Sequence, residues 1–429
     1  MRLGGRLQAA IEVLQDINDR KRPVADALKD WGLSHRFAGA GDRAIIGNIV
    51  YDALRRKLSL AWRMESDSAR DIAFGVLLSD VGMSAEDISA TLDGDRFAPE
   101  PLGADRLDAW AIRDLAQAPD HVQADVPEWC APHLEAVFGQ DWIREASALS
   151  TRPPVDLRVN RLKANRDKVL KELSHAGASP APVLPDAIRI PPLEAMGRHP
   201  NVQAEGAFQK GWFEVQDLGS QIAATLASVK PGEQVLDYCA GAGGKTLALA
   251  AFMENRGQVH AFDADRPRLA PIYDRLKRAG VRNTQVHGHA RDLEPLEGQM
   301  DLVFADAPCT GSGTWRRRPD AKWRLSQQQL ERREQEQREV LAAARSYVKP
   351  GGRLVYVTCS LFASENEDQI ASFLDENADF VAVDPQALWQ AGIEDKTVPL
   401  PLFARHGTVL SPLRNSTDGF YVAMLRRNP

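Results

Sequence analysis

Cysteine is scarce in this chain, and no pattern pairs its few thiols. Four cysteines are spread over 429 residues, with no C-x-x-C pair and no H-x-x-x-H sequence to join them in a metal site: Cys130, Cys239, Cys309 and Cys359. A structural zinc site needs clustered ligands, and a disulfide framework needs a short, cysteine-dense chain. We therefore expect four free thiols and no metal site.

Long apolar runs are also absent. No run approaches the ~20 apolar residues of a membrane-spanning helix. Glu12, Asp16 and Asp19 interrupt the first twenty residues, where a signal peptide needs an unbroken apolar core. These absences predict a cytoplasmic protein with no membrane contact.

The chain has no excess of positive charge. Its formal net charge is −6 at pH 7. Proteins that bind nucleic acid indiscriminately usually carry a strongly basic domain. Any contact with nucleic acid is therefore expected on chosen surfaces, which favours a structured target.

Length and texture indicate two or three domains. Residues 1–125 show apolar residues at helical spacing and predict an all-α domain, and residues 126–217 predict a small α/β connecting segment. In residues 218–429 short apolar runs such as "QVLDYCA", "GQVHAFDAD" and "MDLVFADAP" alternate with helices. This alternation predicts an α/β domain with a mostly parallel sheet covered on both faces. A long charged helix is predicted to begin after Ser326 as its N-cap and to end before "KPGG".

The glycine-rich loop "VLDYCAGAGGKT", residues 235–246, fits neither common phosphate-binding pattern. A P-loop needs glycine five residues before Gly244, where this chain has Cys239. The dinucleotide pattern G-x-G-x-x-G needs a third glycine after Gly241 and Gly243, but that position is Thr246. ATP and dinucleotides are therefore disfavoured as ligands.

A nucleoside cofactor without a pyrophosphate suits the residues that remain. Glycines after the first strand of an open α/β sheet let backbone N–H groups approach a ligand closely. The next strand ends in Asp263, where a carboxylate can accept hydrogen bonds from ribose hydroxyls. S-adenosylmethionine is the common cofactor of this kind. A glycine turn and a strand-ending aspartate with no ligand give the same pattern.

Two cysteines follow two predicted strands at one edge of the sheet. Cys309 lies in "ADAPCTGSGTWRRRPDAKW" and Cys359 in "VTCS". A lone cysteine on an apolar strand is usually a small buried hydrophobic residue. Two cysteines at the mouth of one cofactor pocket instead favour thiol chemistry.

The motifs "CAGAGGKT", "DAPCTGSGTWRRRPDAKW" and "VTCSLFASENED" resemble those of the Sun/RsmB-type RNA (cytosine-5) methyltransferases. The resemblance covers nearly the whole chain, and the helical start is similar to the NusB-like RNA-binding module of bacterial members. It implies a class I, Rossmann-like methyltransferase domain that uses S-adenosylmethionine, preceded by an all-α domain and the connecting segment.

The resemblance also implies catalytic roles. Carbon-5 of cytosine is a poor nucleophile, so the ring must first be activated by a thiolate that adds at carbon-6. By match to the family motifs, Cys359 is that nucleophile and Asp306 holds the polar edge of the cytosine. Cys309 would assist removal of the carbon-5 proton and breakdown of the adduct.

The cofactor residues follow from the same match. The resemblance assigns to the cofactor site Asp263 and Asp306 together with the loop residues Cys239, Ala240, Gly241, Ala242, Gly243, Gly244 and Lys245. The loop departs from the usual Cys-Ala-Ala-Pro-Gly-Gly-Lys by losing the proline. In "VHGHARDL" His289 stands where the family often has an adenine-binding aspartate, which leaves Asp292 as an alternative.

Two basic stretches are candidates for RNA contact. Residues 316–324, "RRRPDAKWR", carry five basic residues and one acid, follow Trp315 and contain Trp323. Such a patch can clamp phosphates and stack an extruded base, although a solvated loop with two packing tryptophans has the same composition. The cations of "DALRRKLSLAWR" and "RKRPVADALK" could follow an RNA backbone or lie on solvated helix faces.

The resemblance implies an enzyme that methylates RNA, with small-subunit ribosomal RNA as the expected substrate. We expect a monomer, a state that no motif in the sequence determines. Transfer RNA is the alternative substrate, and a non-catalytic RNA-binding assembly factor is the alternative class. A DNA cytosine methyltransferase is disfavoured, because those enzymes use a Pro-Cys-Gln cysteine, whereas Thr310 follows Cys309 here.

Overall fold

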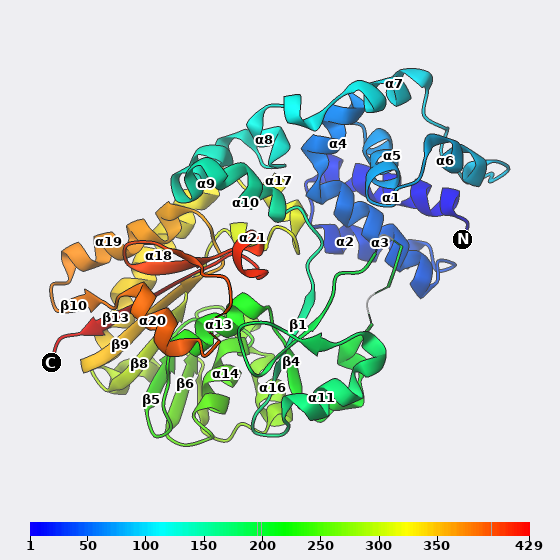
Figure 1. The fold of residues 1–429 in the computed structure, drawn as a ribbon. Helices are drawn as coiled ribbons and strands as arrows, with labels where there is room; N and C mark the ends of the chain where they lie inside the picture. Colours follow the sequence, from blue (N-terminus) through cyan, green and yellow to red (C-terminus); the bar gives the residue numbers. More distant parts are fainter. Residues whose placement is uncertain (195, 199, 396) are drawn as a thin grey trace. The chain divides into compact units, whose positions relative to one another are not determined.

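The computed structural model describes residues 1–194, 196–198, 200–395 and 397–429. It divides into two compact units, shown in Figure 1. The helical unit comprises Met1–Pro153, Pro192–His199 and Thr314–Leu325, and the sheet unit comprises Pro154–Pro191, Pro200–Gly313 and Ser326–Pro429. None of the helices in the described ranges has the length and apolar character needed to cross a membrane. The three-domain division at residues 125 and 217 stays a prediction.

The helical unit is built on amphipathic helices, as its spacing predicts. Their bounds are α1 Leu3–Arg20, α2 Val24–Ser34, α3 Ala40–Arg55, α4 Lys57–Met64, α5 Ala69–Ser79, α6 Ala85–Leu92, α7 Ala104–Ile112, α8 Asp120–Gln123, α9 Ala131–Phe138, α10 Trp142–Ala148 and α17 Pro319–Arg324. The buried faces of α1, α3 and α5 meet in one core through residues such as Leu7, Ile49 and Phe74.

What reads as one continuous helix in the sequence is interrupted at Arg56, between α3 and α4, and the first turn of α4 is bound by the side chain of Asp125. Its carboxylate accepts hydrogen bonds from the backbone N–H groups of Leu58 and Ser59, at 2.9 and 3.0 Å, and from the Ser59 hydroxyl at 2.6 Å. These donors lie in the first turn of α4, where backbone N–H groups have no helical partner. Burial raises the pKa of Asp125.

The segment Thr314–Leu325 belongs to the helical unit, although its neighbours in sequence belong to the sheet unit. Its helix α17 packs on α3. Trp315 and Lys322 are each only 1% exposed. The expectation that this basic stretch offers a tryptophan beside the reactive cysteines is therefore wrong for Trp315, whose ring has no surface to present to a base.

Polar contacts hold this segment in place. The Lys322 Nζ donates to the backbone oxygen of Arg55 at 3.0 Å, and the Trp323 Nε1 donates to that of Leu54 at 2.6 Å. Both oxygens lie at the C-terminal end of α3, where helical carbonyls have no partner of their own. Burial lowers the pKa of Lys322 to about 8.

Cations of the stretch "DALRRKLSLAWR" are also engaged inside the helical unit. Their contacts are Arg55 with Asp52 at 2.7 Å, Arg56 with Asp80 at 2.7 Å, and the Arg63 guanidinium 3.6 Å from the centroid of the Trp110 ring. These three arginines are paired within the fold, and whether the stretch contacts RNA stays a prediction.

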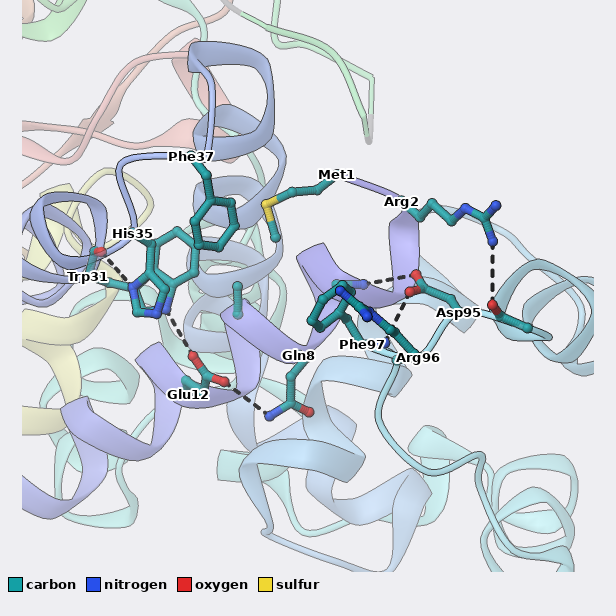
Figure 2. A pocket seen from close by; sticks show the side chains of 14 residues that line it. Met1, Arg2, Gln8, Glu12, Trp31, His35, Phe37, Asp95, Arg96 and Phe97 are labelled. Carbon is teal, nitrogen blue, oxygen red and sulfur yellow. Dashed lines mark hydrogen bonds between the residues drawn. The ribbon is translucent and has the colours of Figure 1, made fainter.

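A groove of about 990 Å³ opens on the helical unit (Figure 2). Trp31 and His35 stack in its wall with ring centroids 4.2 Å apart. Phe37 and Phe97 line it and are 72% and 58% exposed, which is unusual for such large apolar rings. The Arg96 guanidinium lies 4.4 Å from the centroid of the Phe97 ring. The groove therefore combines exposed aromatic surface with a cation.

The sheet unit begins with a small antiparallel sheet. Its strands, in the order β2-β3-β1-β4, are Ser179–Pro180, Ala187–Ile190, Val155–Val159 and Phe213–Val215. The helices α11 Arg166–Glu172 and α12 Gly206–Gln209 accompany it. Leu157, Ile188 and Phe213 lie in its core. This part contains both strands and helices, as expected of a small α/β segment.

The large sheet has nine strands. Eight are ordered β11-β12-β13-β9-β8-β5-β6-β7, and β10 pairs with β13. Their bounds are β5 Gln234–Asp237, β6 Gln258–Phe262, β7 Thr284–His287, β8 Met300–Asp306, β9 Val348–Thr358, β10 Phe380–Ala382, β11 Leu402–Phe403, β12 Gly407–Leu410 and β13 Phe420–Arg427. Strands β5 to β9 pair with one another in parallel. Strands β10 to β13 pair antiparallel, and β13 joins them to β9 by another antiparallel pairing.

Chain order reverses direction at β5, whose neighbours are β6 and β8. Ligands of open α/β sheets bind outside the carboxyl ends of the strands at such a switch point. The carboxyl ends of β5, β6, β8 and β9 are therefore where a site is expected, and all the predicted catalytic and cofactor residues follow or end these strands.

Helices accompany the sheet (Figure 1). They are α13 Leu218–Leu226, α14 Gly244–Phe252, α15 Arg266–Leu269, α16 Ile272–Ala279, α18 Gln327–Ala344, α19 Glu367–Glu376, α20 Pro385–Gly392 and α21 Pro412–Asn415. Ser326 caps α18, as predicted, because its hydroxyl accepts a hydrogen bond from the Gln329 N–H. Helix α18 also ends before "KPGG", as predicted. The stretch "KPGG" itself lies inside β9, where the register with β8 shifts.

Candidate active site

The glycine loop joins β5 to α14 at the carboxyl edge of the sheet. Gly241 and Gly243 have φ of +50° and +84°, a region that favours glycine. A Cβ on Gly243 would lie 2.5 Å from a side-chain carbon of Ile272, so only glycine fits there. Helix α14 then begins at Gly244, so its first N–H groups face the edge where a ligand would lie.

Asp263 follows β6 and faces this loop. Its Oδ2 accepts a hydrogen bond from the Gly241 N–H at 2.8 Å, and its Oδ1 accepts one from the Asp265 N–H at 2.8 Å. Asp263 is only 5% exposed. Asp263 therefore fixes the loop as well as offering a carboxylate, and each oxygen keeps a further lone pair.

Lys245 connects the loop to β8. Its Nζ lies 2.6 Å from the Asp306 Oδ2, and Asp306 is the last residue of β8. The Asp306 side chain is 33% exposed, whereas that of Lys245 is 9% exposed. Lys245 thus holds the inner side of the carboxylate and leaves its other side accessible.

Asp237, the last residue of β5, is fully buried beneath the loop. Its Oδ2 accepts a hydrogen bond from the Thr246 hydroxyl at 2.6 Å. Burial raises the pKa of Asp237 to about 7. This residue connects the end of β5 to the start of α14 and is too deep to contact a ligand directly.

The two strand-end cysteines meet. The Sγ atoms of Cys309 and Cys359 lie 3.3 Å apart, and both residues are half-buried. The hydrogen bond with Cys359, together with burial, raises the pKa of the Cys309 thiol well above its ordinary value. The pair therefore combines one thiol that resists ionisation with a second thiol at contact distance.

Close backbone packing fixes the Cys359 loop. The Gly313 N–H donates to the Cys359 oxygen at 3.0 Å, and the Gly419 N–H donates to the Gly313 oxygen at 2.8 Å. A Cβ on Gly313 would lie 2.2 Å from the Gly419 oxygen. Glycine is therefore required at Gly313 for the segments after β8, after β9 and before β13 to meet.

The two candidates for an adenine-binding residue lie after β7. The His289 Nε2 is 2.8 Å from the Arg266 Nη2, and Asp292 accepts a hydrogen bond from the His289 N–H at 3.0 Å. Asp292 thereby caps the short helix Ala290–Leu296, and both side chains are on exposed residues.

Sequence reasoning missed Glu365, a fully buried acid at the end of the short helix Ala363–Glu365. Its carboxylate accepts hydrogen bonds from residues next to both cysteines. The stretch "ASENED" contains three acids, and its spacing does not show which of them turns inward. No signal in the sequence alone would have singled it out.

Family comparisons agree with this geometry. Residues 224–426 match the family described as 16S rRNA methyltransferase RsmB/F, and residues 126–192 match the ferredoxin-like domain of the RsmF/B-like methyltransferases. Together the two matches span more than half of the chain. The chain belongs to the RsmB/F methyltransferase family. The predicted family resemblance is thereby confirmed.

Curated relatives of this RsmB/F chain carry the same family name. It is 37% identical over 303 residues to the ribosomal RNA small subunit methyltransferase B of Salmonella typhi, a match that covers 70% of this chain. The chain spans 66% of that relative, just under two thirds of its length.

Solved structures confirm the predicted methyltransferase fold. The crystal structure of PH0851 is 26% identical, with a TM-score of 0.74 over 100% of both chains. A methyltransferase homolog protein from Pyrococcus horikoshii is 27% identical, with a TM-score of 0.59 over 72% of this chain and 97% of that one. The sheet unit of this RsmB/F chain thus has the class I, Rossmann-like methyltransferase architecture.

Proposed function

We propose that this protein transfers a methyl group from S-adenosylmethionine to carbon-5 of a cytosine in RNA. The observation that carries the proposal is the contact of Cys309 and Cys359, 3.3 Å apart, at the carboxyl ends of two parallel strands. Asp306 and the glycine loop adjoin the same edge. A structural cysteine pair would have no reason to lie at the edge where ligands of this fold bind.

The residues at the edge fit the proposed cofactor. A Cβ on Gly241 would lie 3.8 Å from the Asp263 Oδ2, so the glycine keeps the space beside this carboxylate open for ribose hydroxyls. The loop residues 239–245 would bind the amino-acid portion through backbone N–H groups, and Asp306 would border it. S-adenosylmethionine supplies an electrophilic methyl group when bound.

Cys359 would act as the nucleophile. Its sulfur forms a bond to carbon-6 of the cytosine, and the electron pair of the 5,6 double bond becomes available at carbon-5 to accept the methyl group. Asp306, ion-paired with Lys245, would bind the polar edge of the base and stabilise charge that develops on the ring.

Cys309 would act after methyl transfer. The carbon-5 proton must leave before the 5,6 double bond re-forms and Cys359 departs with its electron pair. Cys309, in contact with Cys359, is positioned to help move that proton. Its raised pKa keeps the thiol neutral while Cys359 reacts, so Cys309 would first give up its own proton to water before its sulfur accepts the proton from carbon-5.

The proposed substrate is small-subunit ribosomal RNA, supported by the family to which residues 224–426 match. Bisulfite sequencing of total RNA from cells with and without the gene tests this directly. A cytosine mark lost from small-subunit ribosomal RNA supports the proposal, and a mark lost only from transfer RNA would replace it. Intact marks in all RNA would favour a non-catalytic assembly factor.

We expect Asp263→Ala to weaken S-adenosylmethionine binding by ~1–3 kcal/mol, the usual loss for a charge-assisted hydrogen bond. Isothermal titration calorimetry measures this. Asp265→Ala is the matched control, because the Asp265 carboxylate accepts from the Arg268 N–H at 3.2 Å and caps α15 instead. Micromolar binding of ATP with no binding of S-adenosylmethionine would overturn the cofactor assignment.

The groove in Figure 2 is the part of the helical unit that we propose contacts RNA. Exposed aromatic rings offer stacking surface to unpaired bases, worth ~1–3 kcal/mol per base, and arginines bind phosphates. Phe37 and Phe97 supply exposed rings, while Arg2 and Arg96, both exposed, line the same groove. The overall charge of −6 is consistent with binding confined to such a surface.

The double variant Arg2→Glu and Arg96→Glu should raise the RNA KM at least tenfold, leave kcat within twofold, and flatten the salt dependence of binding. Arg144→Glu is the matched control, a 74% exposed arginine of α10 outside the groove. Deleting residues 1–125 is a poorer test, because it would uncover Trp315 and Lys322. An unchanged RNA KM would show that the groove serves another ligand, such as a protein.

A further inference from the structure

Glu365 lies at the end of the short helix Ala363–Glu365 and is 0% exposed. Its Oε1 accepts hydrogen bonds from the Thr310 N–H at 2.8 Å and from the Gln337 Nε2 at 3.0 Å. Its Oε2 accepts from the Thr310 hydroxyl at 2.5 Å and from the Ser360 hydroxyl. Four donors on one buried carboxylate satisfy it without any exposure to water.

The partners of this carboxylate are the direct neighbours of the two cysteines. Thr310 follows Cys309, and Ser360 follows Cys359. One carboxylate therefore connects the segment after β8 to the segment after β9. The two cysteines lie 50 residues apart along the chain. Their segments also meet through the Gly313 N–H to Cys359 oxygen bond at 3.0 Å and the Ser312–Ser360 hydroxyl contact at 2.9 Å, but of the described residues only Glu365 binds the residue directly after each cysteine.

Further hydrogen bonds hold Glu365 itself in place. The Tyr356 hydroxyl donates to the Glu365 backbone oxygen at 2.7 Å. The Asn366 side chain donates to the Ser360 oxygen at 2.9 Å and accepts from the Thr358 hydroxyl at 2.5 Å. These hydrogen bonds fix the backbone around Glu365 to β9. The carboxylate can therefore hold Thr310 at a fixed position relative to β9.

We propose that Glu365 is a positioning residue that sets the separation of Cys309 and Cys359 by binding the residue that follows each of them. The inference rests on the proposed function for its catalytic consequence, but the separation itself can be measured without RNA or cofactor. Misplacing a reacting group by ~1 Å can cost ~100-fold in rate. A carboxylate that controls the thiol separation therefore controls turnover without touching the substrate.

The nearby negative charge has a second effect. The carboxylate of Glu365 contributes to the raised pKa of the Cys309 thiol, after the hydrogen bond with Cys359 and burial. Glu365 thus favours a neutral Cys309 as well as placing it. Replacement by glutamine removes the charge but retains a side chain able to bind Thr310 and Ser360, because a hydroxyl can accept as well as donate.

The test compares Glu365→Ala, Glu365→Gln and the matched control Glu367→Gln. Glu367 is two residues away and binds the Tyr421 hydroxyl at 2.8 Å and the His406 N–H at 3.0 Å, rather than either cysteine segment. Phenylarsine oxide is the probe of separation: its arsenic binds two thiols and releases water only when both sulfurs reach the same atom. Cys309→Ser should abolish this capture and serves as the blank.

We expect Glu365→Ala to weaken arsenical capture at least tenfold and to lower kcat at least 100-fold, with the KM for S-adenosylmethionine within twofold of wild type. Glu365→Gln should restore capture to within threefold, and should shift the pH profile of kcat, because the charge beside Cys309 is gone. Glu367→Gln should match wild type in both measurements. A general loss of structure would not leave the cofactor KM intact.

Arsenical capture by Glu365→Ala equal to wild type would overturn the proposal, whatever the activity. If Glu365→Ala does not fold, Thr310→Val and Ser360→Ala each remove one side of the bridge, and capture should weaken in both. Reduced capture in these variants together with no methyl transfer by wild type on any RNA would support the positioning role and refute the proposed function instead.

Discussion

Cys359→Ala will abolish methyl transfer and form no covalent complex with RNA, whereas Cys309→Ala will transfer one methyl group and then stall as an adduct. The difference follows from when each thiol acts. Cys359 forms the bond to carbon-6, which is the first covalent step, so neither the adduct nor methyl transfer can occur without it. Cys309 is needed when the carbon-5 proton leaves and Cys359 is expelled. Turnover should fall below detection in both variants, but only one should accumulate a complex.

Denaturing gel electrophoresis with labelled RNA and S-adenosylmethionine separates the two outcomes. Cys130→Ala is the control, because Cys130 is buried in the helical unit and should neither trap RNA nor lose turnover. A trapped band with Cys359→Ala would exchange the two roles and make the Pro-Cys cysteine the nucleophile. Full turnover by both variants would exclude a covalent mechanism.

The contact of the two thiols sharpens this prediction. With the Sγ atoms 3.3 Å apart, removal of Cys309 also removes the hydrogen bond that Cys359 makes to it. The adduct should therefore form in Cys309→Ala at a rate that differs from wild type, because Cys359 loses that contact. Its persistence, rather than its rate of formation, is the diagnostic observation.

Much of the sheet unit could be predicted from sequence because its signals are local. Apolar runs predict the buried parallel strands, and Ser326 followed by Gln329 predicts the start of α18, because capping involves residues three positions apart. The sequence also predicts that Cys309 and Cys359 lie close together, because parallel strands place their carboxyl ends at one edge of the sheet.

The contacts that the sequence could not reveal are those made between distant residues. Asp125 caps α4 from 67 positions away, and Glu365 joins residues 310 and 360. In both cases a single carboxylate accepts donors whose positions depend on the finished fold. The stretch 316–324 has the same property: Arg316 and Lys322 are buried whereas Arg318 and Arg324 are exposed, and nothing in the sequence of five cations distinguishes them.

Trp315→Ala will destabilise the helical unit by ~3–5 kcal/mol, the cost of removing a large buried side chain and leaving a cavity. Trp315 is 1% exposed and is the largest of the fully buried side chains among the residues that the structure describes. The loss should lower the first denaturant midpoint if the two units unfold separately. Urea unfolding followed by circular dichroism measures it, and Arg318→Ala, an exposed neighbour, should change stability by no more than ~0.5 kcal/mol.

The same variant distinguishes a packing tryptophan from an RNA-stacking one. Burial predicts that Trp315→Phe, which refills part of the cavity, recovers stability, and that RNA affinity changes only as far as folding does. A stacking role predicts the reverse: unchanged stability and an affinity loss of ~1–3 kcal/mol at constant fold. That second pattern would mean that Thr314–Leu325 leaves the helical unit when RNA binds. The hydrogen bonds from Lys322 and Trp323 to the end of α3 oppose such a release, because breaking them would leave helical carbonyls without partners.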